Sequence, residues 1–195
     1  MSKEEEEEEK EEKWVQLLMP PAEELVPELP MPQQQETPAA ARARLAADLR
    51  SAGVRPGCPL LIHTSLSAVG HVPGGADTVI DALLEAVGPK GTLVIPTLSY
   101  LYTNLDSPTF DVRTTPTNLG TIPETFRSRV GVRRSCHPTH SCAALGPDTT
   151  ALLDDHGKDR SPVGANSPFR RVRDLGGQVH TPYLCPHAPP PRPRA

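Results

Sequence analysis

Residues 60–97, LLIHTSLSAVGHVPGGADTVIDALLEAVGPKGTLVIPT, decide the fold of this chain. The apolar run Leu60–Ile62 predicts a short buried strand, and GTLVIPT at Gly91–Thr97 predicts a second one. Between them, Gly74-Gly75 opens a helix and Gly88-Pro89 closes it. One face of that helix is apolar at helical spacing, with Val79, Ile80, Leu83, Leu84 and Val87. Strand, helix and strand in this order form a βαβ unit, so we expect an α/β fold with a partly parallel sheet.

A further helix is predicted just before this unit. Thr37 is a good capping residue, and Pro38 suits the first helical position. The residues from Ala39 to Ser51 are mostly strong helix formers. Gly53 stands where a left-handed residue commonly ends a helix.

Several shorter elements are predicted after the unit. Thr121 and Glu124 have the spacing of a capping box, which predicts a helix through Phe126 to Val130 that ends at Gly131. Strands are expected at 132–136 and 140–145, and helices near 148–155 and from Ser167-Pro168 to Gly176-Gly177.

The two ends of the chain differ in composition from its centre. Residues 1–13 contain eight Glu and three Lys, and a cluster of six prolines lies toward each end. Such stretches bury too little apolar surface to offset the entropy of ordering them. We therefore expect disordered tails at 1–36 and 181–195 around one domain at 37–180.

Composition also excludes several classes of protein. The sequence has no apolar run long enough to span a membrane, and its acidic amino terminus does not resemble a secretory signal. The central region is nearly neutral and poor in aromatic residues, which argues against a nucleic-acid surface. Four cysteines without disulfide-framework spacing indicate a reducing, cytoplasmic location: Cys58, Cys136, Cys142 and Cys185.

Three segments carry candidate chemistry. HTSLSAVGHVPGG at His63–Gly75 joins a strand to a helix, and its small residues allow backbone N–H groups to face an anion. HPTHS at His137–Ser141 brings two histidines together, and SPVGANSPFR at Ser161–Arg170 predicts a rigid loop that enters a helix. Each segment also has a purely structural interpretation: a connecting loop, hydrogen-bonded core histidines and a capped helix entry.

Zinc is the metal alternative at the second segment. Cys136, His140 and Cys142 lie on one side of an extended chain, but Pro138 disturbs that alternation. No further Cys/His pair has zinc-finger spacing, so we expect no metal.

The three segments together resemble the aminoglycoside 3-N-acetyltransferase family in order and spacing. The resemblance covers roughly residues 58–179 and includes long motifs such as FDVRTTPTNLGTIPETFRSRVGVRRSCHPTHSCAALGP at 110–147. It implies an α/β fold distinct from that of the GCN5-related acetyltransferases. It also implies an acyltransferase that moves an acetyl group from acetyl-CoA to the 3-amino group of the 2-deoxystreptamine ring, an activity of antibiotic-resistance enzymes.

The resemblance implies a site for acetyl-CoA, the co-substrate. The family segment that lines the pantetheine and phosphate path falls on the loop after the first strand of the βαβ unit. The hydroxyl groups of Thr97 and Ser167 and the guanidinium group of Arg113 are further candidates. The expected cofactor-binding residues are Ser65, Leu66, Ser67, Val72, Pro73, Thr97, Arg113 and Ser167.

Acetylation of an amine requires a base, because only the neutral amine can attack the thioester. The family pattern places this role on His140, with His137 as the second choice, since histidine titrates near neutral pH. Glu124 and Asp111 are candidates for the carboxylate that orients the imidazole. Asp106 and Asp111 are expected to receive the ammonium groups of the acceptor.

The sheet is expected to be incomplete. Gln178-Val179 resembles the lead-in to another buried strand, but HTPYLCPHAPPPRPRA follows, with six prolines and no apolar run. The chain thus departs from the family by ending early. The alternatives are a non-catalytic truncated homologue, a gene-model fragment, or an acyl-CoA transferase for another amine, and each is compatible with a homo-oligomer.

Overall fold

The computed structural model of the protein describes residues 36–181. Its helices are α2 (Pro38–Ser51), α3 (Leu66–Val69), α4 (Gly75–Val87), α5 (Thr121–Arg127), α6 (Thr149–Leu153), α7 (Pro168–Asp174) and the 3-10 helix η1 (His156–Lys158). Its strands are β1 (Pro59–Ile62), β2 (Thr92–Pro96), β3 (Arg133–Arg134), β4 (Cys142–Leu145) and β5 (Gln178–His180).

The strands form one mixed sheet in the order β3-β4-β2-β1-β5. β1 runs parallel to both β2 and β5, whereas β4 runs antiparallel to β2 and β3. The β1–α4–β2 segment is the predicted βαβ unit, and the α/β fold class is confirmed. The predicted tails lie outside the described residues, except for Glu36 and Thr181 at the boundaries.

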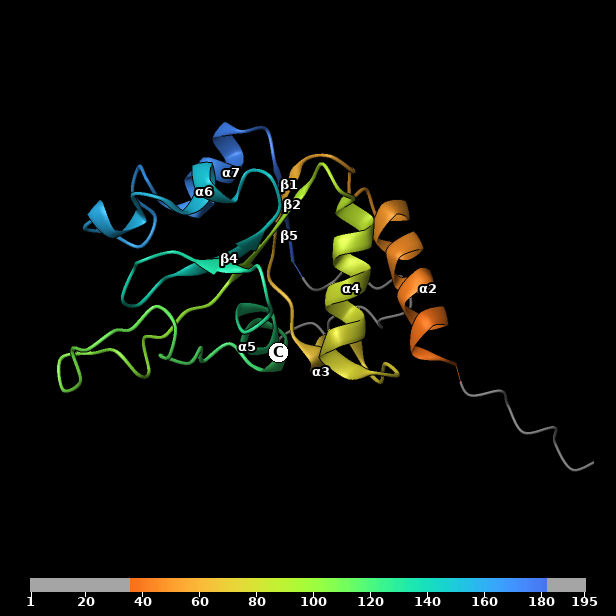
Figure 1. The fold of residues 1–195 in the computed structure, drawn as a ribbon, viewed down its shortest axis with the longest axis horizontal. Coiled ribbons are helices and arrows are strands. Elements are labelled where there is room, and N and C mark those ends of the chain that lie inside the picture. The colour runs from red at the N-terminus through yellow and green to blue at the C-terminus, as the bar shows by residue number, and fades with distance from the viewer. Residues whose placement is uncertain (1–35, 182–195) are drawn as a thin grey trace, which may run out of the picture. The chain divides into compact units, whose positions relative to one another are not determined.

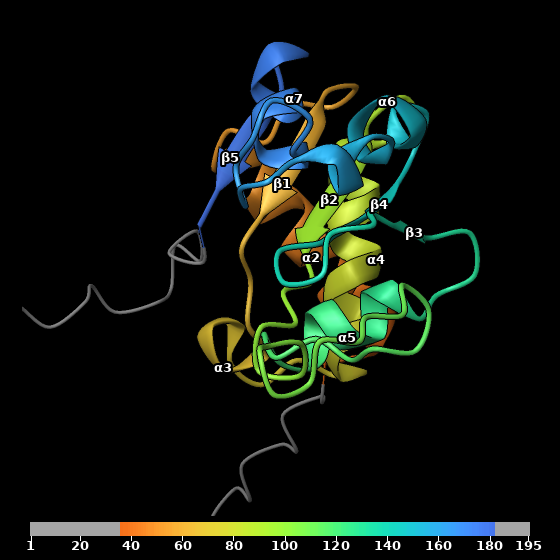
Figure 2. The same ribbon diagram turned by 90° about the vertical axis from the view of Figure 1, so that its left-hand side faces the viewer.

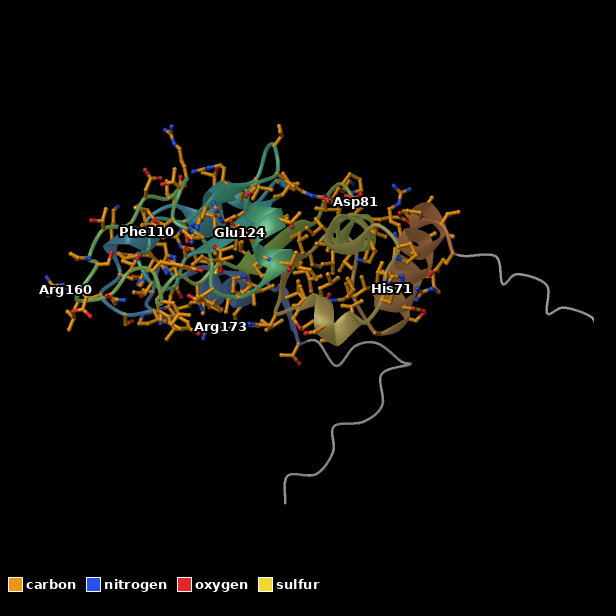
Figure 3. All side chains as sticks on the ribbon, turned by 90° about the horizontal axis from the view of Figure 1, so that it is seen from below. His71, Asp81, Phe110, Glu124, Arg160 and Arg173 are labelled. Atoms are coloured by element: carbon orange, nitrogen blue, oxygen red, sulfur yellow. The ribbon has the colours of Figure 1, made fainter. Side chains whose placement is uncertain are left out.

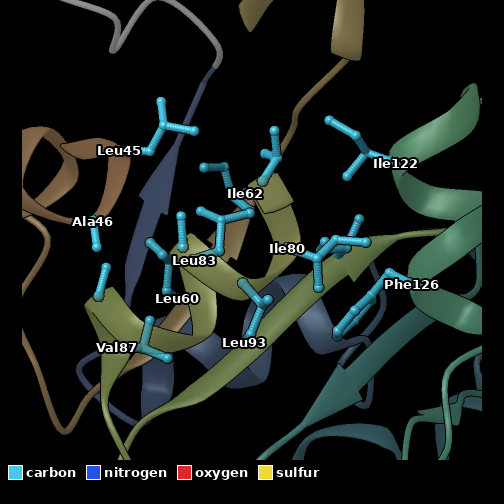
Figure 4. Packing of buried hydrophobic residues seen from close by; sticks show 14 of the residues in the cluster. Leu45, Ala46, Leu60, Ile62, Ile80, Leu83, Val87, Leu93, Ile122 and Phe126 are labelled. Atoms are coloured by element: carbon cyan, nitrogen blue, oxygen red, sulfur yellow. The ribbon is translucent and has the colours of Figure 1, made fainter. Parts of the chain in front are cut away.

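One face of the sheet is covered by α2, α4 and α5 (Figure 1). Leu60, Ile62, Leu93 and Ile95 point from β1 and β2 to this face, where they meet the apolar side of α4 (Figure 4). Complete burial of each such aliphatic side chain contributes about 1.5–3 kcal/mol. The apolar residues of α4 that recur at helical spacing in the sequence are therefore the ones that pack into the main core.

The opposite face is covered by α6 and α7 (Figure 2). Leu61 and Val94, the residues between those of the first face, pack here against Leu152, Leu153 and Val172. Alternate strand residues thus serve two separate hydrophobic clusters. This explains why β1 and β2 are continuous apolar runs without a polar side.

The ends of α2 and α4 follow the sequence predictions. Thr37 caps α2 by accepting a hydrogen bond from the N–H of Ala40 at 3.2 Å, and Gly53 has a φ of 97°. Gly74 precedes α4 with a φ of 80°, and a Cβ atom added there would lie 2.3 Å from Thr78 Oγ1. Position 74 therefore requires glycine for the fold itself.

The predicted capping box of α5 is wrong. The residue before the helix is Gly120, with a φ of 99°, and Thr121 is the first helical residue. The carboxylate of Glu124 instead accepts a hydrogen bond from the N–H of Thr117 at 2.9 Å and pairs with Arg127. The helix also ends at Arg127 rather than at Val130, because the following residues form a turn.

Strand β5 occupies one end of the sheet. It pairs with β1 through Leu60–Gln178 and Leu61–Val179, and the side chain of Val179 is 59% exposed. The strand expected at Gln178-Val179 is thus present as an edge strand. No helix within residues 36–181 is long and apolar enough to cross a membrane.

Candidate active site

The three candidate segments meet at one edge of the sheet. Because β1 and β2 are parallel, the residues that follow them, His63 and Thr97, leave the sheet at the same edge. β4 is antiparallel, so the segment that precedes it, ending at Ser141, returns to this edge. The third segment contributes Phe169, whose ring stacks on that of His63 at 6.2 Å. Ligands of open α/β sheets typically bind at such carboxyl ends of parallel strands.

A cavity of about 200 Å³ lies at this edge. Its lining comes from the carboxyl ends of β1 and β2 and from the start of α5: Ile62, His63, Thr64, Ser65, Ile95, Pro96, Leu119 and Pro123. Ser65 caps the short helix α3 by accepting from the N–H of Ala68 at 3.3 Å, and its Oγ lies 3.1 Å from Ser67 Oγ. The predicted loop therefore borders a cavity through its first three residues.

His137 holds the turn that carries the second histidine. Its Nδ1 accepts hydrogen bonds from the backbone N–H groups of His140 at 3.0 Å and Thr139 at 3.3 Å. An atom that accepts from backbone N–H groups carries no proton, so the ring is neutral with its proton on Nε2. Burial, followed by the nearby His140, lowers the pKa of His137 and favours this neutral form. His137 therefore stabilises the turn as a hydrogen-bond acceptor.

His140 is the more available imidazole. It is half-buried, its Nδ1 lies 2.9 Å from Thr139 Oγ1, and its Nε2 bonds to no residue within 36–181. Its ring lies 5.9 Å from that of His137 and 6.2 Å from that of Tyr100. Burial lowers the pKa of His140, so the ring is neutral near pH 7 and able to accept a proton.

The two candidate carboxylates are engaged elsewhere. Both oxygens of Glu124 accept hydrogen bonds from Arg127, and one also accepts from Thr117 N–H. Burial alone raises the pKa of Glu124, but these bonds together bring it below its usual value. Asp111 accepts from the N–H groups of Arg113 and Thr114, which lowers its pKa. Neither carboxylate bonds to a histidine in this structure.

Two of the predicted cofactor hydroxyls are buried within the protein. Thr97 is fully buried, and its Oγ1 lies 3.2 Å from both Ser141 Oγ and Arg134 Nε. Ser167 is also fully buried and caps α7 by accepting from the N–H of Arg170 at 3.3 Å. Their bonds stabilise the site's framework and leave them no exposed surface for a cofactor.

The other predicted residues lie at varied depths. Val72 is buried in the cluster beneath α4, where its side chain does not line the cavity, and Leu66 packs against the same cluster. Pro73 is half-buried. Asp106 and Arg113 are exposed, and Asp106 lies in the loop between β2 and α5 that extends from the sheet (Figure 1).

A sequence model described as "Aminoglycoside 3-N-acetyltransferase" matches residues 61–181. The chain belongs to this family. The match covers more than half of the chain and includes β1, α4, β2 and the HPTHS segment.

Curated and solved relatives agree with the assignment. Aminoglycoside N(3)-acetyltransferase VII of Streptomyces paromomycinus is 39% identical over 155 residues, which cover 71% of this chain and 54% of that protein. The solved structure of AAC-IIIb with CoASH is 30% identical with a TM-score of 0.64, covering 72% of this chain and 58% of that one. AAC-VIa bound to sisomicin is 34% identical with a TM-score of 0.64 and the same coverage. The chain spans about half the length of the curated relatives it matches.

His156 is a residue of this acetyltransferase-family fold that sequence reasoning missed. It is fully buried in η1, its Nδ1 lies 2.8 Å from Ser135 Oγ, and its ring lies 4.7 Å from that of His137. Its Nε2 has no hydrogen-bond partner among the described residues. Burial, followed by His137, lowers the pKa of His156 to about 4. Nothing in the sequence indicated that His156 lies near the HPTHS segment, because only the tertiary fold brings η1 next to this turn.

Arg134 and Ser99 were also missed. The guanidinium of Arg134 donates to Thr97 O at 2.8 Å and to Ser141 Oγ at 2.9 Å, which ties β2 to β4. Ser99 Oγ donates to Pro138 O at 2.7 Å and fixes the other side of the HPTHS turn. Within residues 36–181, no group of three His, Cys, Asp or Glu side chains is arranged to hold a metal ion.

Proposed function

We propose that this chain acts in acetyl-CoA-dependent acetylation of the 3-amino group of the 2-deoxystreptamine ring of aminoglycosides. The observation that carries the proposal is the family match over residues 61–181, which includes the loop that borders the cavity at the sheet edge. The complexes of relatives with CoASH and with sisomicin support the two substrate classes. The resulting activity is of the antibiotic-resistance type and draws on cytoplasmic acetyl-CoA.

We assign acetyl-CoA to the cavity at the sheet edge, where it would lie against the loop His63–Gly75. Ser65 and Ser67 offer hydroxyl groups, and the first residues of α3 have N–H groups without an intrahelical partner. These donors suit the amide and phosphate oxygens of acetyl-CoA. Leu66 is held in place by the core beneath α4, which keeps the turn rigid.

The base is assigned to His140 rather than His137. His137 Nδ1 already accepts two backbone hydrogen bonds, so protonating it would break the turn. His140 Nε2 is free of such bonds within the described part of the chain and is attached to a turn fixed from both sides. Asp106 and Asp111, both exposed, are assigned to the ammonium groups of the acceptor.

The first test separates binding from turnover. The full chain is titrated with CoA by calorimetry and then assayed with acetyl-CoA and gentamicin-type or kanamycin-type acceptors. We expect saturable CoA binding and a 3-N-acetylated product identified by mass spectrometry and NMR. CoA binding without turnover would support the non-catalytic alternative, and an absence of both would overturn the proposal.

The second test addresses His140. His140→Ala and His140→Gln should each lower kcat about 10²–10⁴-fold at neutral pH, because neither side chain can take the proton. CoA affinity and the midpoint of thermal unfolding should stay close to wild type. The deficit should shrink as the pH rises, since the free amine becomes abundant without a base. A folded His140→Ala protein with wild-type kcat at pH 7 would remove His140 from the mechanism.

A further inference from the structure

Four arginines line a second hollow on the surface, which we call the arginine pocket. It has a volume of about 470 Å³ and is formed by the segment before α5, the end of α5 and strand β3. Its charged residues are Arg113, Arg127, Arg133 and Arg134, and its remaining lining residues are Val112, Ser128 and Val132. Among residues 36–181, no acidic side chain lines the pocket. Like charges gathered in this way repel one another unless anions compensate them.

Within residues 36–181, carboxylates form ion pairs with two of these four guanidinium groups, while Glu124 and Asp111 act only at longer range on Arg134 and Arg113. Arg127 pairs with Glu124, with its Nε at 2.8 Å from Oε2, and Arg133 pairs with Asp154 at 2.7 Å. Neither Arg113 nor Arg134 forms an ion pair with a carboxylate among residues 36–181. The Asp111 carboxylate accepts hydrogen bonds from its own loop, through the N–H groups of Arg113 and Thr114. The pocket therefore keeps an excess of positive charge.

Three of the guanidinium groups are fixed in position by the protein. Arg127 Nη1 donates to Arg113 O at 2.8 Å, and Arg133 Nη1 donates to Thr150 Oγ1 at 2.9 Å. Arg134 bonds to Thr97 and Ser141, and its guanidinium lies 5.1 Å above the ring of Phe110. These contacts leave further N–H donors on each group, since a guanidinium has five. A site whose donors are already held in place loses less side-chain entropy on binding.

Burial makes the charge of Arg134 costly, and Glu124 offsets only part of this cost. It is half-buried, and burial, followed by the charge of Arg127, lowers the pKa of Arg134 to about 10. The group stays charged at neutral pH. A bound anion would relieve the repulsion between these two arginines.

We propose that the arginine pocket binds a phosphoryl group. A phosphate dianion matches the two guanidinium groups that lack carboxylate partners, and its oxygens accept the forked donors of arginine. The source is either a phosphate of CoA or a free phosphate anion, and both present the same chemistry. One source, a phosphate of CoA, rests on the proposed function, because Arg113 is among the residues expected to bind acetyl-CoA. The other source, a free phosphate anion, does not.

The test measures binding of inorganic phosphate to the full chain by calorimetry in a chloride buffer. Arg113→Gln removes the guanidinium group that has no hydrogen-bond partner among residues 36–181. Arg173→Gln is the matched control, because Arg173 is 68% exposed, pairs with Asp174 and lies on α7, at the opposite end of the molecule from α5 (Figures 1 and 2). Phe110 and Glu124, which are labelled in Figure 3, contact the pocket's arginines Arg134 and Arg127. Both variants change the net charge equally.

We expect saturable phosphate binding that weakens about tenfold or more in Arg113→Gln and stays unchanged in Arg173→Gln, because charge-assisted bonds carry the affinity. CoA and dephospho-CoA distinguish the sources. A preference for CoA that disappears in Arg113→Gln identifies its 3′-phosphate, whereas phosphate binding that neither CoA nor dephospho-CoA displaces identifies a free anion. An absence of saturable phosphate binding, or an equal loss in both variants, would overturn the proposal.

Discussion

On one face of the sheet, α2, α4 and α5 bury a continuous apolar cluster, whereas the face beneath α6 and α7 combines a smaller cluster with buried polar groups. The first face contains Leu83 and Phe126, which have no polar atoms to satisfy. The polar side contains His156 and Ser167, each fully buried and hydrogen-bonded.

The stability of the two faces therefore depends on different kinds of interaction. Apolar packing is insensitive to pH and depends mainly on volume. Buried polar groups depend on every partner, because an unsatisfied donor or acceptor is costly in a low dielectric. The HPTHS turn is built on the polar contacts of Ser99, Ser135 and His156, so its geometry is expected to respond to pH while the first face does not.

The largest loss of stability is expected from a substitution on the face covered by α2, α4 and α5. Phe126→Ala removes a fully buried ring and should lower the free energy of unfolding by about 3–5 kcal/mol. Chemical denaturation at pH 5.5 and pH 7.5 should give the same loss. Val130→Ala is the control, because Val130 is fully exposed and its change should stay within about 0.5 kcal/mol. A loss that varies with pH would contradict the comparison.

The next effect is expected at His156. Its pKa is about 4 in the folded protein and ordinarily 6.5, so the unfolded chain binds the proton more readily. Stability should therefore fall as the pH drops from 6.5 to 4, by up to about 3 kcal/mol from this residue. His156→Phe should show a shallower dependence on pH in urea unfolding. His63, His137, His140 and His180 have pKa values lowered in the same direction and should leave a residual slope. Identical slopes for the two proteins would count against the assignment.

The smallest effect compares two helix caps. Thr37→Ala removes an exposed cap of α2 and should cost about 1 kcal/mol. Ser167→Ala removes a buried hydroxyl that caps α7 and donates to Gly164 O at 2.9 Å, so that Arg170 N–H and Gly164 O keep only their backbone bonds to residue 167. We expect a loss of about 2 kcal/mol by thermal unfolding. Equal losses of stability in Thr37→Ala and Ser167→Ala would show that burial does not increase the contribution of a helix cap.

The first face was predictable because its signals are local. The period of α4, the glycines that flank it and the cap at Thr37 all act within a few residues. The capping box failed because nearby competitors bind Glu124: its carboxylate accepts hydrogen bonds from Arg127, three residues later, and from Thr117 N–H, seven residues earlier. Both partners are local, so spacing alone did not decide which of them the carboxylate would bind.

The candidate site was predictable only in part, for a related reason. The loop at Ser65 and the turn at His140 follow or precede strands, which places them at the sheet edge. His156 and Arg134 contribute through contacts with residues far away in sequence, and nothing near them distinguishes them from surface residues. Arg133, the neighbour of Arg134, faces solvent and Asp154 instead. Such differences arise from the tertiary fold.

The pairing of β1 with β5 has a consequence for the time course of folding. Leu60 pairs with Gln178, so more than half of the 195 residues lie between partners in the same sheet. During synthesis, β1 can pair with β2 long before β5 leaves the ribosome, and one side of β1 stays open until then. Contacts this distant slow folding, because a long loop must close before the contact forms.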